Sequence, residues 1–176
     1  MRIEINEPGS EAFYREVVNV SGQHRRLMRK PEAKLRDHFR ALRVNIILCA
    51  VFLALNLVMA LTWGADTLSW VAGVLMVFCI ALNGGFLMQY HRLLRALMAR
   101  DGAAVLTVDE SGVELDREGV QKVRLDWSTV AFVRVFQESL CFVPREAGSL
   151  LVAVDRKYAA QVLEELRHCA PDVKVY

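Results

Sequence analysis

The sequence lacks the short motifs that mark many enzyme active sites. It contains no glycine-rich phosphate loop of the GxGxxG or GxxxxGK[ST] type, no HExxH zinc helix and no GxSxG nucleophile elbow. The four histidines, His24, His38, His91 and His168, are scattered along the chain. These absences predict that the protein is not an enzyme, and a cryptic hydrolase is the least favoured function.

Cysteine is sparse and irregularly spaced. Cys49, Cys79, Cys141 and Cys169 form no CxxC pair or other metal-ligand spacing. The first two lie in strongly apolar runs, so we expect reduced, structural thiols rather than a disulfide framework or a zinc site. The sequence therefore predicts no metal and no cofactor.

Charge is almost absent from the middle of the chain, although Asp, Glu, Lys and Arg make up 24% of the sequence. Between Arg43 and Arg92 the only residue of these four types is Asp66, which separates the apolar runs 44–63 and 68–90. Each run is long enough to cross a membrane, which takes about 20 residues. Neither shows the polar face of a soluble core helix. We expect two transmembrane helices; the alternative is a buried helical hairpin in a soluble domain.

The turn between the two runs, residues 64–67, is so short that the helices must form an antiparallel hairpin. The turn contains no Lys or Arg. Arginines instead flank the ends of both runs that are far from the turn, and such residues mark the cytoplasmic side. The flanking residues that we expect to contact lipid headgroups are Arg36, Arg40, Arg43, Arg92 and Arg95. The sequence thus predicts a multi-pass protein of the cell inner membrane with both termini cytoplasmic and membrane lipids as partners.

Three residues of the apolar region have expected roles in the membrane. Trp63 and Trp70 flank the turn and are predicted to lie at the outer interface, where indole rings are enriched. Asn56 is expected near mid-membrane. Its amide can pair with a second copy in a homo-oligomer or with a backbone carbonyl, and both remain open.

The N-terminal region is expected to contain a strand at residues 1–6 and a helix at 11–21 capped by Ser10. A second helix is expected to start at Pro31 and to continue into the first span. The stretch 24–43 has eight Lys/Arg against two acidic residues. A specific lipid or nucleic-acid site is one interpretation. An ordinary headgroup anchor is favoured and no nucleic-acid partner is predicted, because interleaved aromatic residues for base stacking are missing.

The C-terminal region changes to a period of two after residue 103, which is typical of strands. Turn residues separate six expected strands, near 103–108, 112–116, 119–126, 129–136, 139–144 and 149–154. A helix of about 156–169 follows. The predicted fold class is an α+β membrane protein, in which a transmembrane hairpin carries a small antiparallel β-barrel or sandwich capped by a C-terminal helix. This layout resembles a pleckstrin-homology-like domain.

The chain also resembles the YcxB-like family of bacterial membrane proteins. The resemblance rests on the two closely spaced spans, on "LTVDESGVEL" and on "VRLDWSTVAFVRVFQESLCFVP", in which the family features fall on Asp109, Gly112, Leu125 and Trp127. It implies a pleckstrin-homology-like cytoplasmic domain on a two-span anchor, with no enzyme chemistry.

The predicted organisation runs through six segments. They are a cytoplasmic strand, helix and basic juxtamembrane helix at 1–43, spans at 44–63 and 68–90 around the external turn 64–67, a cytoplasmic helix extension at 91–102, and the β domain at 103–176. The leading function is a membrane protein with a cytoplasmic binding or scaffold domain and a protein partner. The alternatives are an immunity or inhibitor protein against a membrane-acting toxin, and a subunit of an oligomeric channel or transporter.

Overall fold

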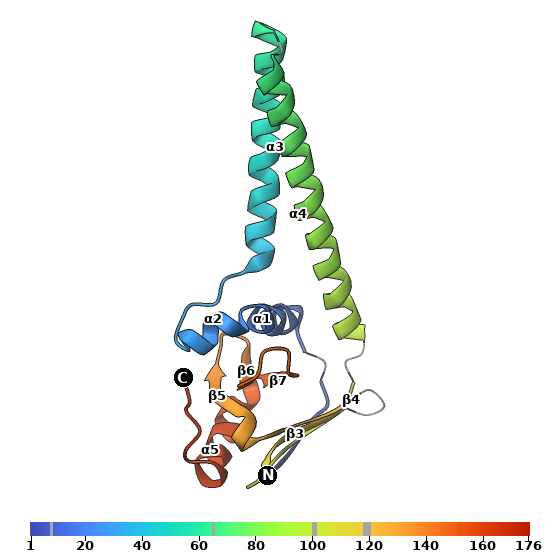
Figure 1. Ribbon diagram of the computed structural model, residues 1–176. Helices are drawn as coiled ribbons and strands as arrows, with labels where there is room; N and C mark the ends of the chain where they lie inside the picture. The colour runs from blue at the N-terminus through green and yellow to red at the C-terminus, as the bar shows by residue number, and fades with distance from the viewer. Residues whose placement is uncertain (8, 65, 100–101, 118–120) are drawn as a thin grey trace. The chain divides into compact units, whose positions relative to one another are not determined.

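The computed structural model describes residues 1–176 except 8, 65, 100–101 and 118–120. It is an α+β structure with two compact units, drawn in Figure 1. Unit 1 comprises Met1–Arg36 and Leu94–Tyr176, and unit 2 comprises Asp37–Leu93.

The elements follow the chain in a simple order. They are β1 (Arg2–Ile5), α1 (Glu11–Gly22), α2 (His24–Arg29), α3 (His38–Trp63), α4 (Thr67–Ala99), β2 (Ala104–Val108), β3 (Gly112–Arg117), β4 (Gln121–Asp126), the 3₁₀ turn η1 (Trp127–Thr129), β5 (Val130–Val135), β6 (Ser139–Pro144), β7 (Val152–Asp155), the 3₁₀ turn η2 (Arg156–Tyr158) and α5 (Ala159–Cys169).

Unit 2 consists of α3 and most of α4, both long and apolar enough to cross a membrane. No residue in the most apolar part of either helix is buried, so the described residues do not support the alternative of a buried hairpin. Asp66 starts α4, because its Oδ1 accepts hydrogen bonds from the Ser69 backbone N–H (2.8 Å) and hydroxyl (2.6 Å). The hydroxyl contact is the main reason that the pKa of Asp66 is below its ordinary value.

The first sheet of unit 1 has the order β1-β2-β3-β4 and is antiparallel throughout. The strand nearest the N-terminus pairs with β2 over four residues, from Arg2 opposite Thr107 to Ile5 opposite Ala104. Unit 1 is therefore built from both sides of the two long helices, whereas the expected domain contained residues 103–176 only. The periodicity of a four-residue strand does not reveal its distant partner.

The second sheet has the order β5-β6-β7 and is also antiparallel. Between β4 and β5 the chain turns through η1, and the two strands belong to different sheets. Of the two expected forms, the closed barrel is therefore wrong, and two small sheets are present. Over the described residues, the strand positions expected from the sequence agree closely, except that β7 begins at Val152 rather than near residue 149. Positions 119 and 120 of the expected strand 119–126 lie outside the described residues.

The two sheets and α5 share one hydrophobic core. Fully buried side chains come from both sheets and from the helix: Leu106, Val113, Leu140, Phe142, Val152 and Val162. This core accounts for the period-two pattern of β2, in which alternate residues are buried. Strand β6 is buried along its whole length, because a second cluster packs α1 against its Cys141 and Val143 side chains.

The segment after α5 covers the outer edge of β5. The backbone N–H of Val133 donates to the Lys174 carbonyl (2.8 Å), and that of Val135 donates to the Tyr176 carbonyl (3.0 Å). The Tyr176 ring meets Phe132 edge-on at 5.5 Å. Both edges of β5 are therefore paired, one with β6 and the other with this segment.

Helix α1 is capped by Ser10, whose Oγ accepts from the Phe13 backbone N–H (3.0 Å), as expected. Further along α1, the Glu16 carboxylate binds the turn between β5 and β6. It accepts hydrogen bonds from the backbone N–H groups of Gln137 (3.1 Å) and Glu138 (2.9 Å) and from the Ser139 hydroxyl (2.7 Å). One side chain thus fastens α1 to the second sheet.

The expectation that Pro31 starts a helix running into the first span is wrong, because α2 and α3 are separated by a non-helical segment. Side chains elsewhere in unit 1 satisfy the backbone of that segment. The Gln23 amide donates to the Arg36 carbonyl (2.7 Å) and accepts from its N–H (3.0 Å), and Arg134 donates to the carbonyls of Pro31 and Ala33. These tertiary hydrogen bonds replace those that a helix would make.

Candidate functional site: the cleft beside strand β4

The five arginines expected at the headgroups are all exposed. Arg40 and Arg43 on α3 and Arg92 on α4 belong to unit 2, whereas Arg36 and Arg95 belong to unit 1. None of them forms an ion pair with another described residue. Their guanidinium groups are therefore open to solvent or headgroups, and the lipid role stays a prediction.

The polar and aromatic residues of unit 2 lie as follows. Trp63 and Trp70 are 82% and 69% exposed on either side of the turn. Asn56 lines an apolar cleft of about 400 Å³ between α3 and α4, and its Oδ1 would lie 3.7 Å from a Cβ placed on Gly73. Asn83, by contrast, donates to the Cys79 carbonyl in its own helix (2.8 Å). Pairing of Asn56 with a second copy stays a prediction.

The four residues that carry the family resemblance meet at one corner of the first sheet. The Asp109 carboxylate accepts hydrogen bonds from the Ser111 hydroxyl and from the backbone N–H groups of Ser111 (2.8 Å) and Gly112 (3.0 Å). The Asp109 carbonyl accepts from Trp127 Nε1 at 2.9 Å. Hydrogen bonding from Ser111 holds the pKa of Asp109 below its ordinary value. We name this group, Asp109, Gly112, Leu125 and Trp127, the corner clasp.

Gly112 fits the corner clasp because it has no side chain. A Cβ at this position would lie 2.3 Å from the Leu125 carbonyl oxygen and 3.0 Å from the Asp126 Cα, both of them backbone atoms of β4. Leu125 itself is buried in the core, and the Trp127 ring packs against Phe142 with centroids 6.2 Å apart. The corner clasp is thus a packing element that fixes β4, and it contains no reactive arrangement.

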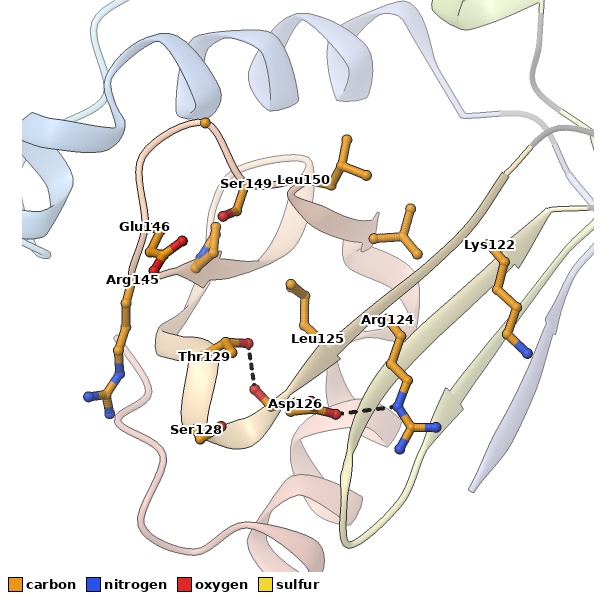
Figure 2. Close-up of a pocket in the computed structure, with 13 residues that line it drawn as sticks. Lys122, Arg124, Leu125, Asp126, Ser128, Thr129, Arg145, Glu146, Ser149 and Leu150 are labelled. Carbon is orange, nitrogen blue, oxygen red and sulfur yellow. Dashed lines mark hydrogen bonds and ion pairs between the residues drawn. The ribbon is translucent and has the colours of Figure 1, made fainter.

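Beside the corner clasp, a cleft of about 660 Å³ lies between β4 and the loop from β6 to β7 (Figure 2). Its inner wall is apolar, formed by Val123, Leu125, Pro144 and Leu150. Hydroxyl groups are contributed by Ser128, Thr129 and Ser149, and charged residues of both signs form the rim: Lys122, Arg124, Asp126, Arg145 and Glu146. A volume of this size and a mainly apolar wall with a few polar groups are typical of ligand sites.

Each cation of the rim has a partner within the protein: Lys122 and Arg124 as follows, and Arg145 through its Nε, which donates to the Val130 carbonyl (3.3 Å). Lys122 Nζ lies 2.8 Å from Glu114 Oε1, and this contact raises the pKa of Lys122. Arg124 donates to Asp126 Oδ1 (3.3 Å) and to the Ser111 hydroxyl (2.8 Å), and Figure 2 shows both basic side chains on the opposite side of β4 from Leu125. Lys122 and Arg124 are therefore not directed at an anion in the cleft.

The cleft also exposes the edge of a sheet. In the described residues β4 pairs only with β3. The backbone N–H of Trp127 donates to the Ser111 carbonyl, so these two residues form a hydrogen-bonded pair. Hydrogen-bonded and non-hydrogen-bonded pairs alternate along antiparallel strands. The residues of β4 that are hydrogen-bonded to β3 are therefore Leu125 and Val123. The backbone groups of Lys122 and Arg124 consequently point to the free edge, where an added strand could bond to them.

The cleft offers binding groups rather than a reactive set. The described residues that line it include no histidine and no cysteine, and the Thr129 hydroxyl donates to the Asp126 carbonyl (2.7 Å). Elsewhere in unit 1, burial raises the pKa of the Cys141 thiol to about 12, which keeps it protonated and unreactive. Among the described residues, no group of three His, Cys, Asp or Glu side chains could hold a metal ion.

Sequence reasoning missed this cleft. Arg145 and Glu146 lie between two expected strands, and Ser149 and Leu150 were expected to begin the last of them, whereas all four belong to one loop. No local sequence signal marks the cleft, because the 53% exposure of the Leu150 side chain is set by the tertiary structure.

Comparison of the chain with protein-family models, with curated proteins and with solved structures gives no match.

Proposed function

We propose that this protein is a non-enzymatic, membrane-anchored binding module of the bacterial inner membrane. In this proposal α3 and α4 cross the membrane as a hairpin, and unit 1 is a pleckstrin-homology-like domain of the YcxB-like type on the cytoplasmic side. The cleft beside β4 receives an extended segment of a partner protein, which pairs with the free edge of that strand. The observation that carries the proposal is an open sheet edge inside a cleft with an apolar wall.

The connectivity of unit 1 supports a hairpin. Residues before α3 and after α4 fold into one sheet through the pairing of β1 with β2. Both ends of unit 2 must therefore lie on the same side of any membrane that α3 and α4 cross. The exposed arginines favour the cytoplasmic side.

The orientation predicts a specific labelling pattern. A cysteine replacing Asp66 is expected to react with a membrane-impermeant maleimide in intact cells, whereas a cysteine replacing Ser111 is expected to react only after the cells are lysed. Both positions are solvent-exposed, so accessibility in the lysate is the control. The reverse pattern would overturn the topology.

Strand addition explains the features of the cleft better than a small anionic ligand does. Backbone hydrogen bonds to an edge strand supply affinity, and alternate side chains supply specificity. The outer edge of β5 is already covered by residues 174–176, whereas β4 is open beside an apolar wall.

The test removes one backbone donor of β4. A random heptapeptide library would be panned against the full-length protein in nanodiscs, with empty nanodiscs as the background. The variant Arg124→Pro lacks the backbone N–H of residue 124, which points to the free edge of β4. Proline is tolerated at such positions, so the pairing with β3 is retained. We expect enriched peptides to bind this variant at least tenfold more weakly than the unmodified protein.

The matched control is Arg124→Ala, which loses the same guanidinium contacts but keeps the N–H. We expect it to bind within about threefold of the unmodified protein, because exposed ion pairs contribute little. Equal binding by the proline and alanine variants, or no enrichment above empty nanodiscs, would overturn strand addition at β4.

A further inference from the structure

A smaller hollow opens beside the cleft, also within unit 1. Its volume is about 190 Å³. Its apolar wall is built by α1, the end of α4, β3, β7 and the residue before β7, through Phe13, Val17, Leu97, Leu115, Ala153 and Leu151. We call it the apolar chamber.

The apolar chamber and the cleft share two wall residues. Val123 and Leu150 line both, so the two spaces are neighbours with these side chains at their boundary. Leu150 is 53% exposed, and its side chain is therefore not fixed by packing on all sides. A side chain held in the cleft would reach the apolar chamber across this boundary.

The wall of the apolar chamber favours an uncharged apolar group. The two polar residues on it, Tyr14 and Arg117, both have interactions within the protein. Apolar cavities of roughly 150 Å³ remain dry and accept a molecule of the size of benzene. The apolar chamber is slightly larger, which suits the side chain of phenylalanine or leucine.

Strand geometry directs such a side chain into the apolar chamber. Val123 and Leu125 alternate with Lys122 and Arg124 along β4 and face inward. A strand added to the free edge of β4 would place every second side chain on the same inward face, level with a residue of β4. The side chain beside Val123 would then lie at the boundary with Leu150.

We infer that the apolar chamber is the specificity pocket of the strand-addition site. It takes one phenylalanine or large aliphatic side chain, the anchor, from an extended partner segment. The inference rests on the proposed function, because the β4 edge holds the backbone that carries the anchor. It adds the chemistry of the partner, which is a segment with an apolar anchor on its inward face.

The experiment uses peptides enriched in the panning described above. We expect them to share one Phe, Leu, Ile or Met position, and replacement of that residue by alanine should weaken binding at least tenfold. Ala153→Leu fills the apolar chamber from β7 and should weaken binding of the anchored peptide to the same extent. The peptide with alanine at the anchor position should bind this variant and the unmodified protein equally well.

The outcomes separate the two proposals. Loss of binding in Arg124→Pro, together with no effect of either Ala153→Leu or anchor removal, would overturn the anchor while leaving strand addition intact. Equal weakening of both peptides by Ala153→Leu would also overturn it, since the damage would then be general. If Ala153→Leu does not fold, Val17→Phe fills the apolar chamber from α1 and serves the same comparison.

A fluorescent fatty acid provides a competing occupant. If Ala153→Leu abolished binding of this probe but left peptide binding unchanged, the apolar chamber would be assigned to an acyl chain. That result would overturn the inference. Displacement of the probe by the anchored peptide, but not by the alanine version, is the expected result.

Discussion

Replacing Gly112 with alanine is expected to destabilise unit 1 by about 1–3 kcal/mol, the usual range for forcing extra atoms into a packed site. The new Cβ would lie 2.3 Å from the Leu125 carbonyl oxygen. Because the obstructing atoms are backbone, no side-chain rotation can relieve the contact, and β3 must move away from β4. The contacts of the corner clasp between β3 and β4 would then be broken. Because β4 forms one wall of the cleft, the cleft would change with them.

The buried thiol of Cys141 provides the measurement. Cys141 is fully buried, so maleimide reaches it only when the second sheet opens. Its labelling rate in the full-length protein in detergent can be followed by mass spectrometry of the peptide that contains it. Each 1.4 kcal/mol changes the equilibrium constant for opening about tenfold. We therefore expect Cys141 in Gly112→Ala to be labelled about five- to 150-fold faster than in the unmodified protein.

Gly102→Ala is the matched control for Gly112→Ala. A Cβ at Gly102 meets no atom within 4 Å, so the same chemical change should leave the labelling rate almost unaltered. Equal rates in the two variants would show that the close approach at Gly112 does not limit the stability of unit 1.

Replacing Glu16 with alanine is expected to destabilise unit 1 by about 1.5–3 kcal/mol, the range for a hydrogen bond to a charged group. The three donors it serves differ in exposure. The N–H groups of Gln137 and Glu138 lie in a turn that water can reach, whereas Ser139 is fully buried. Without Glu16, the Ser139 hydroxyl keeps only its contact with Cys141 Sγ at 3.3 Å. The lost hydrogen bond from Ser139 to Glu16 therefore accounts for most of the expected loss of stability.

The same thiol assay measures the Glu16 variant, because Ser139 and Cys141 are on the same strand. We expect labelling to accelerate by about ten- to 150-fold, using the same conversion. Glu11→Ala, an exposed change on the same helix, should cost less than about 1 kcal/mol through the helix dipole alone. An acceleration no greater than that of Glu11→Ala would contradict the proposed fastening of α1.

Much of the secondary structure could be predicted because it depends on local patterns. The lack of charge between Arg43 and Arg92 predicts α3 and α4, and the period of two after residue 103 predicts β2 to β7 within a few residues. Ser10 as the cap of α1 follows from residue type and position. In each case the signal lies within a short window of sequence.

The parts that could not be predicted depend on contacts between distant residues. Pro31 looks like a helix start, but the hydrogen bonds from Gln23 and Arg134 hold its segment in another conformation. The separation of β4 from β5, and therefore the open edge and its cleft, is a property of sheet pairing. Gly112 could be singled out from sequence, but the reason for it, the backbone of β4, is visible only in the structure.

The pairing of β1 with β2 also sets an order of events during synthesis. The two strands are nearly a hundred residues apart in the chain, and both long helices are made between them. The ribosome therefore releases β1 early, and this strand must wait without its partner until the second helix has emerged. A chain in which only one helix crossed the membrane would leave β1 and β2 on opposite sides, with no complete first sheet. Under the proposed topology, the first sheet can therefore be completed only in a chain whose two long helices both cross the membrane.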